Sequence, residues 1–351
     1  MDADTSSSFS ASVISTDAPA LPSAQPAALR LHPVAILSIA YSALALGLYP
    51  ETYLSLLAIY AQKFAIVLPM AVLAILTLLA IQRRAVSPIR FISATLWECR
   101  IRLAATVLIS LIVLTAFTTL KSNIPNIVGF YADPHLAAMD ELLHGGEPWR
   151  LTHRLPEATG LLVDFVYSRI WFGVIFANLL FVALMESGRR YLRYCAAMVA
   201  IFVINGTVLA VAFSSVGPIF YGEFFGPGRF VGLTETITGN AYIQTVPVYA
   251  DYLLESYRSG SALLGSGISA MPSVHVSLAV LTAWYLTSLG RTAALAGWGL
   301  ALFTQFGSVY TGWHYAVDGY LAAITVSLIW LGLSRYWRLP LTAGSRLSTT
   351  S

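Results

Sequence analysis

Charged residues are scarce in this sequence. They make up 11% of its 351 residues, whereas hydrophobic residues make up 57%. Soluble domains carry about 25% charged residues, so most of this surface must face something other than water, and lipid is the environment that fits. The net charge of +3 is small, and no run of Lys and Arg resembles a nucleic-acid-binding stripe. We therefore expect a membrane protein that binds no nucleic acid.

Cysteines and metal-binding motifs are also scarce. The two cysteines, Cys99 and Cys195, both fall near the side that we predict to be cytoplasmic, which argues against a disulfide framework and against a zinc cluster. The sequence has no HExxH motif, and no group of acidic residues suggests a divalent-cation site. We expect an activity that needs no metal and no other cofactor.

The N-terminus has no basic segment of the kind that begins a signal peptide. Residues 1–28 are instead rich in Ser, Ala and Pro, a composition typical of disordered tails. We expect a disordered tail over 1–28, one membrane domain over 29–338 and a short cytoplasmic tail over 339–351.

Long apolar runs are what the sequence has in quantity. A membrane helix needs roughly 20 mostly apolar residues, and about eight segments meet that requirement. We therefore expect an all-α bundle of about eight transmembrane helices. The segments lie near 33–50, 61–82, 102–120, 161–185, 192–215, 271–289, 292–309 and 313–334.

The basic residues fall on one side of this predicted bundle. Because cytoplasmic loops carry an excess of Lys and Arg, that side is predicted to be cytoplasmic, together with both termini. Most acidic residues fall in the outward segments, about 121–160 and 216–270. A bacterial plasma membrane with a periplasmic site fits this pattern, and an organelle membrane with a luminal site has the same geometry. The inner basic residues are Arg83, Arg84, Arg90, Arg100, Arg102, Arg189, Arg190, Arg193, Arg291, Arg335, Arg338 and Arg346.

The first outward segment contains a predicted short helix. Asp133 suits the N-cap, Pro134 suits the first helical position, and Gly145 suits the residue after the end. We expect this helix to lie flat on the membrane surface. Its predicted apolar face consists of Leu136, Met139, Leu142 and Leu143.

Two histidine motifs stand at the outer ends of the last predicted helices. Residues 271–275 have the sequence Met-Pro-Ser-Val-His, and residues 314–318 have the sequence His-Tyr-Ala-Val-Asp. Ionisable residues at the edge of hydrocarbon are functional candidates by default. On a helix, His314 and Asp318 would share one face, so the carboxylate could engage one imidazole nitrogen and leave the other free to attack. This spacing predicts a histidine nucleophile.

The first of these motifs suggests a phosphate site. A helix N-terminus presents unpaired N–H donors to an anion, and Ser273 could either cap that helix or bind phosphate. His275 would lie one turn inside the helix, where it could give a proton to a leaving oxygen. Only residues 310–313 separate the last two predicted helices, which keeps His314 on the same outer face. The two motifs together predict a phosphoryl-transfer site.

At these residues the sequence resembles a known family. Pro-Ser-x-His at 272–275 and His-x-x-x-Asp at 314–318 look like the second and third signature motifs of the type-2 phosphatidic acid phosphatase superfamily. The sequence Tyr-Thr-Gly-Trp-His-Tyr-Ala-Val-Asp at 310–318 is most similar to its inositol phosphorylceramide synthase branch, which consists of inositolphosphotransferases. The specific match covers about 265–320.

The resemblance implies a double-displacement reaction on lipid substrates in the bilayer. His314 would attack phosphorus and form a phosphohistidine, and Asp318 would orient it. His275 would protonate the departing alcohol and then deprotonate the incoming one. The acceptor is water in a phosphatase and a lipid hydroxyl in a transferase.

The sequence departs from the family pattern at its cations. Phosphatase members usually carry an Arg where this chain has Ser308, and the usual Arg-Pro after the first-motif lysine is missing after Lys121. The synthase branch also tends to lack the former Arg, which favours a transferase. Phosphoryl transfer needs cations on the equatorial oxygens. Lys121 is our first candidate, followed by Arg169, Arg150 and Arg229.

These candidates also have simpler interpretations. Lys121 could instead anchor its helix at the lipid headgroups. Asp164 and Arg169 fall within a predicted helix, where charges are costly, and they could pair inside the bundle or line a substrate cleft.

We therefore predict a membrane lipid phosphotransferase that moves a headgroup such as phosphoinositol from a phospholipid to a ceramide-like acceptor. The alternative in the same superfamily is a lipid phosphate or polyprenyl-phosphate phosphatase. A non-enzymatic transporter or lipid-binding scaffold is predicted to have broken helices near the bilayer midplane and inverted repeats, and the sequence shows neither. A metal-dependent hydrolase would need a third ligand near the histidines.

Overall fold

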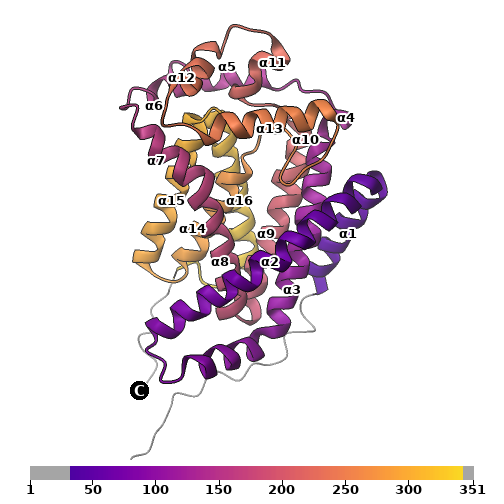
Figure 1. The fold of residues 1–351 in the computed structure, drawn as a ribbon, viewed down its shortest axis with the longest axis vertical. Helices are drawn as coiled ribbons and strands as arrows, with labels where there is room; N and C mark the ends of the chain where they lie inside the picture. Colours follow the sequence, from indigo (N-terminus) through magenta and orange to yellow (C-terminus); the bar gives the residue numbers. More distant parts are fainter. Residues whose placement is uncertain (1–31, 343–351) are drawn as a thin grey trace, which may run out of the picture.

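The computed structural model describes residues 32–342, and this part of the chain is helical, without a β-strand (Figure 1). The all-α prediction is therefore confirmed. The predicted tail over 1–28, and residues 343–351 of the predicted cytoplasmic tail, lie outside the described residues. Five described helical segments are long and apolar enough to cross a membrane. They are Pro50–Gln82, Pro88–Ser122, Thr159–Met185, Gly188–Ala212 and Ala316–Tyr336.

The predicted count of about eight spans is not confirmed. Two more predicted segments form apolar helices that are shorter than 18 residues, Pro33–Leu48 and Val274–Thr287. The segment predicted at 292–309 forms α15 (Arg291–Tyr310), which has 20 residues but does not reach the hydropathy of the five spans. Thr304, Gln305 and Ser308 lower its hydropathy near the end that approaches the histidines.

The first helices extend further than the apolar runs that predicted them. Starts near 61 and 102 were predicted, whereas α2 begins at Pro50 and α3 at Pro88. Proline is favoured in the first turn, where its missing N–H costs nothing, and a helix continues into polar residues that hydropathy does not mark. The N-terminal helices are α1 (His32–Leu48), α2 (Pro50–Gln82) and α3 (Pro88–Ser122).

Two of the spans contain a π-helical turn. Such turns inside α-helices are frequent at functional sites. The first turn carries Tyr167 and the second carries Asn205, and both residues are buried. One span consists of α7 (Thr159–Phe165), η2 (Val166–Ile170) and α8 (Trp171–Met185); the other consists of α9 (Gly188–Val203), η3 (Ile204–Val208) and α10 (Leu209–Ala212).

The last three helices complete the bundle. α14 (Val274–Thr287) and α15 form an antiparallel hairpin, and α16 (Ala316–Tyr336) packs against α14 and α9. Gly297 lets the hairpin close, because a Cβ there would lie 2.8 Å from the Cα of Ala283. Arg193 of α9 donates to Ser334 Oγ at 3.0 Å and lies over the Trp330 ring at 4.0 Å. These contacts join α9 to α16.

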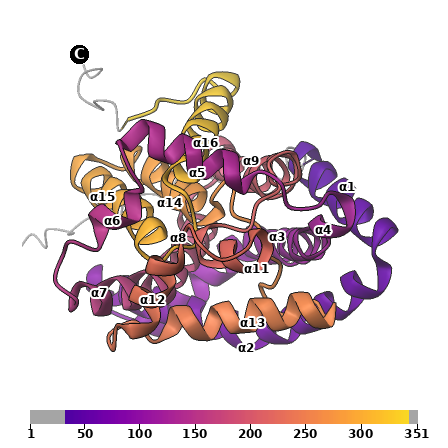
Figure 2. The same ribbon diagram turned by 90° about the horizontal axis from the view of Figure 1, so that it is seen from above.

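A layer of short helices, which we call the cap layer, covers one end of the bundle (Figures 1 and 2). α14 and α16 begin beneath this layer, and the α2–α3 turn and the end of α16 lie at the opposite end (Figure 1). The elements of the cap layer are α4 (Ile124–Ile127), α5 (Asp133–His144), α6 (Pro148–Thr152), η4 (Pro218–Phe220), α11 (Tyr221–Phe225), α12 (Val231–Gly239) and α13 (Thr245–Ser259).

The predicted short helix corresponds to α5. Its end is as predicted, because Gly145 follows it with a left-handed φ of 69°. The start of the helix differs from the prediction, because Ala132 is the N-cap and Asp133 is already helical. The predicted apolar face is also divided: Leu136 is buried, whereas Leu142 is 84% exposed. The helix therefore presents one face to the bundle and another, which includes Leu142, to its surroundings.

Candidate active site

The structure brings the two histidine motifs together beneath the cap layer. His275 lies in the first turn of α14, and His314 lies in the turn between α15 and α16. Their ring centroids are 6.4 Å apart, with 57° between the ring planes. A tetrahedral phosphoryl group can contact both rings across a gap of this size.

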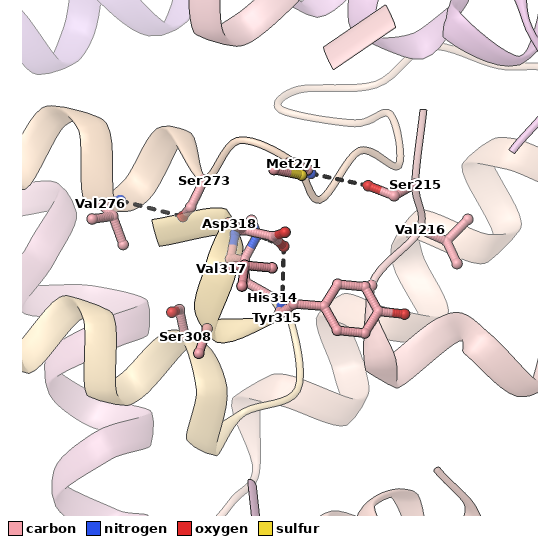
Figure 3. Close-up of polar contacts among 12 residues, drawn as sticks. Ser215, Val216, Met271, Ser273, Val276, Ser308, His314, Tyr315, Val317 and Asp318 are labelled. Carbon is pink, nitrogen blue, oxygen red and sulfur yellow. Dashed lines mark hydrogen bonds and ion pairs between the residues drawn. The ribbon is translucent and has the colours of Figure 1, made fainter. Parts of the chain in front are cut away.

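His314 precedes α16 rather than lying within it. A helix over 313–334 was predicted, but α16 begins at Ala316 with Tyr315 as its N-cap. Asp318 Oδ2 accepts a hydrogen bond from the Tyr315 N–H at 3.0 Å and lies 3.3 Å from His314 Nδ1 (Figure 3). The prediction of a shared helical face was wrong, because the capping turn produces the pair. The carboxylate can nevertheless fix the tautomer of the imidazole.

Backbone contacts hold this turn in place. The His314 N–H donates to the Ser308 carbonyl oxygen at 3.2 Å. Gln305 Nε2 donates to the Ala316 carbonyl oxygen at 3.0 Å. Gly312 has a φ of 71°, a left-handed conformation that favours glycine. The position where phosphatases carry an Arg, Ser308, thus supports the turn through its backbone.

Two buried carboxylates of α5 support the same turn from above. Asp140 accepts hydrogen bonds from the N–H groups of Ala316 at 2.7 Å and Val317 at 2.9 Å. Asp133 accepts from the Tyr315 hydroxyl at 2.9 Å and also from two backbone N–H groups of the 216–217 loop. Asp140 thereby occupies the donors at the start of α16 that could otherwise bind an anion.

Sequence reasoning assigned Asp140 no role and Asp133 only a capping role. The two residues are seven apart, which is two helical turns, so both lie on one helix face. This spacing is the sequence feature that could have predicted a shared role for them. Burial raises the pKa of both carboxyl groups, while the N–H donors act in the opposite direction. The hydrogen bonds that they accept make both carboxylates structural acceptors for the turn that carries His314.

We expect Asp140→Ala to loosen the His314 turn. Asp140 is 4% exposed, and losing a capping acceptor costs about 0.5–2 kcal/mol. Thermal unfolding in detergent should occur at a lower temperature, and turnover should fall about tenfold. The neighbouring Glu141→Ala is the control, because the Glu141 side chain is 60% exposed. Equal effects of the two variants would contradict this role.

His275 is held by aromatic side chains. Its ring stacks on Tyr167, with centroids 5.1 Å apart and 16° between planes, and packs on Trp171 at 4.3 Å. Trp171 Nε1 also donates to the His275 carbonyl oxygen at 3.2 Å. These contacts fix the orientation of the His275 imidazole.

Ser273 caps α14. Its Oγ accepts from the Val276 N–H at 3.3 Å, and the residue is fully buried (Figure 3). The sequence allowed Ser273 either to cap this helix or to bind phosphate, and in the structure its hydroxyl caps the helix. The Ser273 N–H also donates to the Asp318 carbonyl oxygen at 3.3 Å, so the starts of α14 and α16 are joined.

The predicted cations occupy different places. Lys121, at the end of α3, lines the same cavity as His275 and His314. Arg169 does not line it; its Nη1 lies 3.6 Å from Asp164 Oδ2, the acid that also accepts from the N–H groups at the start of α13. Arg150 pairs with Glu147, and Arg229 with Glu141 and Glu147. The structure therefore places Lys121 at the histidines and the three arginines in ion pairs.

The cavity that reaches the histidines has a volume of about 570 Å³. Its walls are mostly apolar and come from α2, α3, α8 and α9, with Lys63 and Lys121 among the few charged lining residues. Ligand pockets of this kind, with apolar walls and a few polar groups, usually measure about 300–1,000 Å³. The cavity suits an amphipathic molecule whose polar end lies at the histidines.

The environment of His314 favours its neutral form. Burial and the positive charge of Lys121 lower the pKa of His314 to about 3, although the contact with the Ala270 backbone raises this pKa. The imidazole is therefore neutral near pH 7 and keeps a lone pair, which a nucleophile requires.

Within residues 32–342, no group of three His, Cys, Asp or Glu side chains is arranged to hold a metal ion.

Comparison with known families agrees with this geometry. A family model described as PAP2 superfamily matches residues 134–333, which include both histidine motifs. The chain belongs to the PAP2 superfamily. Membership indicates a lipid phosphatase or phosphotransferase that acts on lipid substrates in a bilayer. Searches of curated proteins and of solved structures found no match.

Proposed function

We propose that this PAP2 superfamily protein is a lipid phosphotransferase that works through a phosphohistidine. It would transfer phosphoinositol, or a similar headgroup, from a phospholipid to a ceramide-like acceptor. The observation that carries the proposal is the mostly apolar cavity of about 570 Å³, whose lining includes His275, His314 and Lys121. A lipid acceptor fits such a cavity better than water does.

In the first half of the reaction, His314 Nε2 attacks phosphorus, because Nδ1 faces Asp318. The P–O bond to the departing alcohol breaks, and His275 donates a proton to that oxygen. In the second half, His275 takes the proton of the incoming hydroxyl, whose oxygen attacks the phosphohistidine and displaces His314. Lys121 stabilises the negative charge on the phosphoryl oxygens in both transition states.

The burial of His314 favours a transferase over a phosphatase. Only 7% of the residue is exposed, so bulk water has little access to a phosphohistidine. A hydroxylated lipid in the cavity would instead bring its hydroxyl to the phosphorus as a positioned reactant. This is also consistent with the Ser308 position, which lacks the arginine of the phosphatases.

The acceptor assay tests this function. Purified protein in nanodiscs is given headgroup-labelled phosphatidylinositol, with and without ceramide, in the presence of a chelator. A labelled phosphosphingolipid that forms only with ceramide supports the transferase. Release of phosphate from lipid phosphates, without transfer, would show the phosphatase instead. Loss of activity in chelator would indicate a metal-dependent enzyme, and no turnover would favour a scaffold.

We further propose that the cap layer faces the outer or periplasmic side of a plasma membrane and that both termini are cytoplasmic. The α2–α3 and α8–α9 turns are at the end away from the cap layer. Arg83 and Arg84 lie in the first of these turns, and Arg189 and Arg190 follow the second in the first turn of α9, as the positive-inside rule requires.

This orientation predicts an accessibility result. Glu235 in α12 and Val86 in the α2–α3 turn are both exposed, while the native Cys99 and Cys195 are buried. On intact cells, an impermeant maleimide should label Glu235→Cys, and it should label Val86→Cys only after the membrane is opened. The reverse pattern would contradict the orientation.

A further inference from the structure

Lysine is the rarest charged residue of this chain. Only two of the 20 basic residues are lysines, Lys63 and Lys121. Both line the cavity that reaches the histidines, whereas none of the described residues that line it is an arginine or an acid. In the described part of the chain, every ion pair uses an arginine or a histidine as its cation. The cavity therefore holds two ammonium groups and no carboxylate to balance them, and such groups in an apolar wall indicate a ligand site.

The register of α2 and α3 places Lys63 deeper in the bundle than Lys121. α2 runs away from the cap layer and α3 runs toward it, because the turn that joins them lies at the opposite end (Figure 1). The hydroxyls of Tyr60 and Thr118, which are 2.7 Å apart, join the two helices one turn from each lysine. Counting three residues along each helix, the two lysine Cα atoms are separated by roughly 10 Å along the bundle.

Helix geometry directs the two lysine side chains toward each other. Long side chains on a helix lean toward its N-terminus, which is toward the cap layer for Lys63 and away from it for Lys121. The Lys121 ammonium accordingly lies 5.9 Å from the ring centroid of Phe117, one turn earlier on α3. Phe117 lines the same cavity. The flexible stems of the two lysines therefore let both ammonium groups face one phosphoryl group.

A transferring phosphoryl group needs more positive charge than one lysine supplies. Negative charge spreads over three equatorial oxygens in the transition state, and preorganised cations stabilise it. This chain has Ser308 where phosphatases carry an arginine, and the three arginines predicted as alternatives form ion pairs away from the histidines. Lys63 is the other cation of the cavity wall.

We propose that Lys63 is the second phosphate-binding cation of this site. Its ammonium binds the phosphoryl oxygens of the donor lipid from the membrane side, opposite Lys121, and takes the place of the missing arginine. The ligand is a phosphate attached to an apolar chain, and the chain lies between α2 and α3, whose apolar residues line the cavity. The effect of Lys63 on transfer rests on the proposed function, but its binding of an anion can be measured without turnover.

The binding test uses dodecylphosphonate, which carries an alkyl chain and a phosphonate that cannot be transferred because its P–C bond is stable. We expect Lys63→Met to raise the Kd of dodecylphosphonate about tenfold, since a hydrogen bond between charged groups is lost. Lys63→Arg should stay within about threefold of the wild type, because it keeps the charge. Methylphosphonate, which lacks the chain, should bind the wild type at least about tenfold more weakly; equal affinity would contradict a lipid ligand.

The matched control is Arg154→Met, which also removes one positive charge. Arg154 is exposed and does not line the cavity, so this variant should bind dodecylphosphonate as the wild type does. Lys63→Met should unfold at or above the wild-type temperature, because it removes an unpaired charge from an apolar wall. An unchanged Kd in Lys63→Met would overturn the inference, and so would a Lys63→Arg variant that binds as weakly as Lys63→Met.

Headgroup transfer is then measured on the same variants. We expect kcat/KM for the donor lipid to fall about a hundredfold in Lys63→Met, because a cation on the transition state is lost, and Lys63→Arg should recover most of it. If the wild type transfers no headgroup while Lys63→Met still weakens dodecylphosphonate binding, the proposed function fails and the role of Lys63 stands. If the wild type transfers headgroup and Lys63→Met matches it in kcat/KM and in Kd, the role of Lys63 fails and the proposed function stands.

Discussion

Replacing His314 with alanine is expected to reduce headgroup transfer by at least about a thousandfold. Removing a nucleophile removes the covalent route altogether, and only binding and charge stabilisation remain. In the proposed mechanism, the imidazole of His314, with its Nδ1 3.3 Å from the Asp318 carboxylate, is the group that attacks phosphorus. The measurement is the rate of labelled headgroup transfer in nanodiscs that contain both donor and acceptor lipids.

A histidine outside the site provides the control for this variant. His135 lies on α5, is exposed and takes no part in the contacts around His314. His135→Ala should transfer headgroup at the wild-type rate. Substantial transfer by His314→Ala, with a thermal unfolding temperature like that of the wild type, would show that another group attacks phosphorus.

Replacing His275 with alanine is expected to slow transfer by about 10²–10⁴-fold, the usual contribution of a general acid. The loss should depend on the leaving group. A donor analogue that releases nitrophenolate needs no proton at the departing oxygen, so His275→Ala should form the phosphohistidine from this analogue at nearly the wild-type rate. The measurement is the first-turnover release of nitrophenolate.

His153 is a suitable control for His275, because it too stacks on a tyrosine. Its ring lies 4.1 Å from that of Tyr310, at an interplanar angle of 13°. His153→Ala should keep transfer with both donors. If His275→Ala is equally slow with the nitrophenyl donor and the natural lipid, then His275 acts on something other than the leaving oxygen.

Much of the bundle was predictable from hydropathy, but helix ends were not. Apolar runs locate the parts of α2 and α3 that suit lipid, whereas the helices themselves begin at Pro50 and Pro88. The π-helical turns at 166–170 and 204–208 leave no mark in hydropathy. They depend on how side chains pack against neighbouring helices, which a single sequence does not display.

The site shows the same division between local and long-range information. His275, His314 and Asp318 could be singled out as a candidate site from the sequence because each motif is contiguous, and the structure brings the three side chains close together. Asp133 and Asp140 reach Tyr315, Ala316 and Val317 across more than 170 residues. Such contacts require the folded chain, since nothing in the sequence pairs α5 with α16.

The cations were the least predictable part. Lys121 and Arg169 were both candidates for the phosphate-binding cation, yet of these two only Lys121 lines the cavity with the histidines. Arg169 instead forms an ion pair with Asp164, which lies only five residues earlier in the sequence; the two charged groups are 3.6 Å apart. Whether a charged residue binds substrate or a neighbouring acid depends on which partner the fold brings nearer.

The most direct test of phosphoryl transfer through His314 is to trap the covalent intermediate. The protein is mixed with donor labelled at the phosphorus, without acceptor, and quenched in alkali, in which phosphohistidine survives; the labelled peptide is then identified by mass spectrometry. We predict label on His314 in the wild type, its loss in His314→Ala and its discharge when ceramide is added. Label on another residue, or transfer to ceramide without any labelled intermediate, would contradict the mechanism.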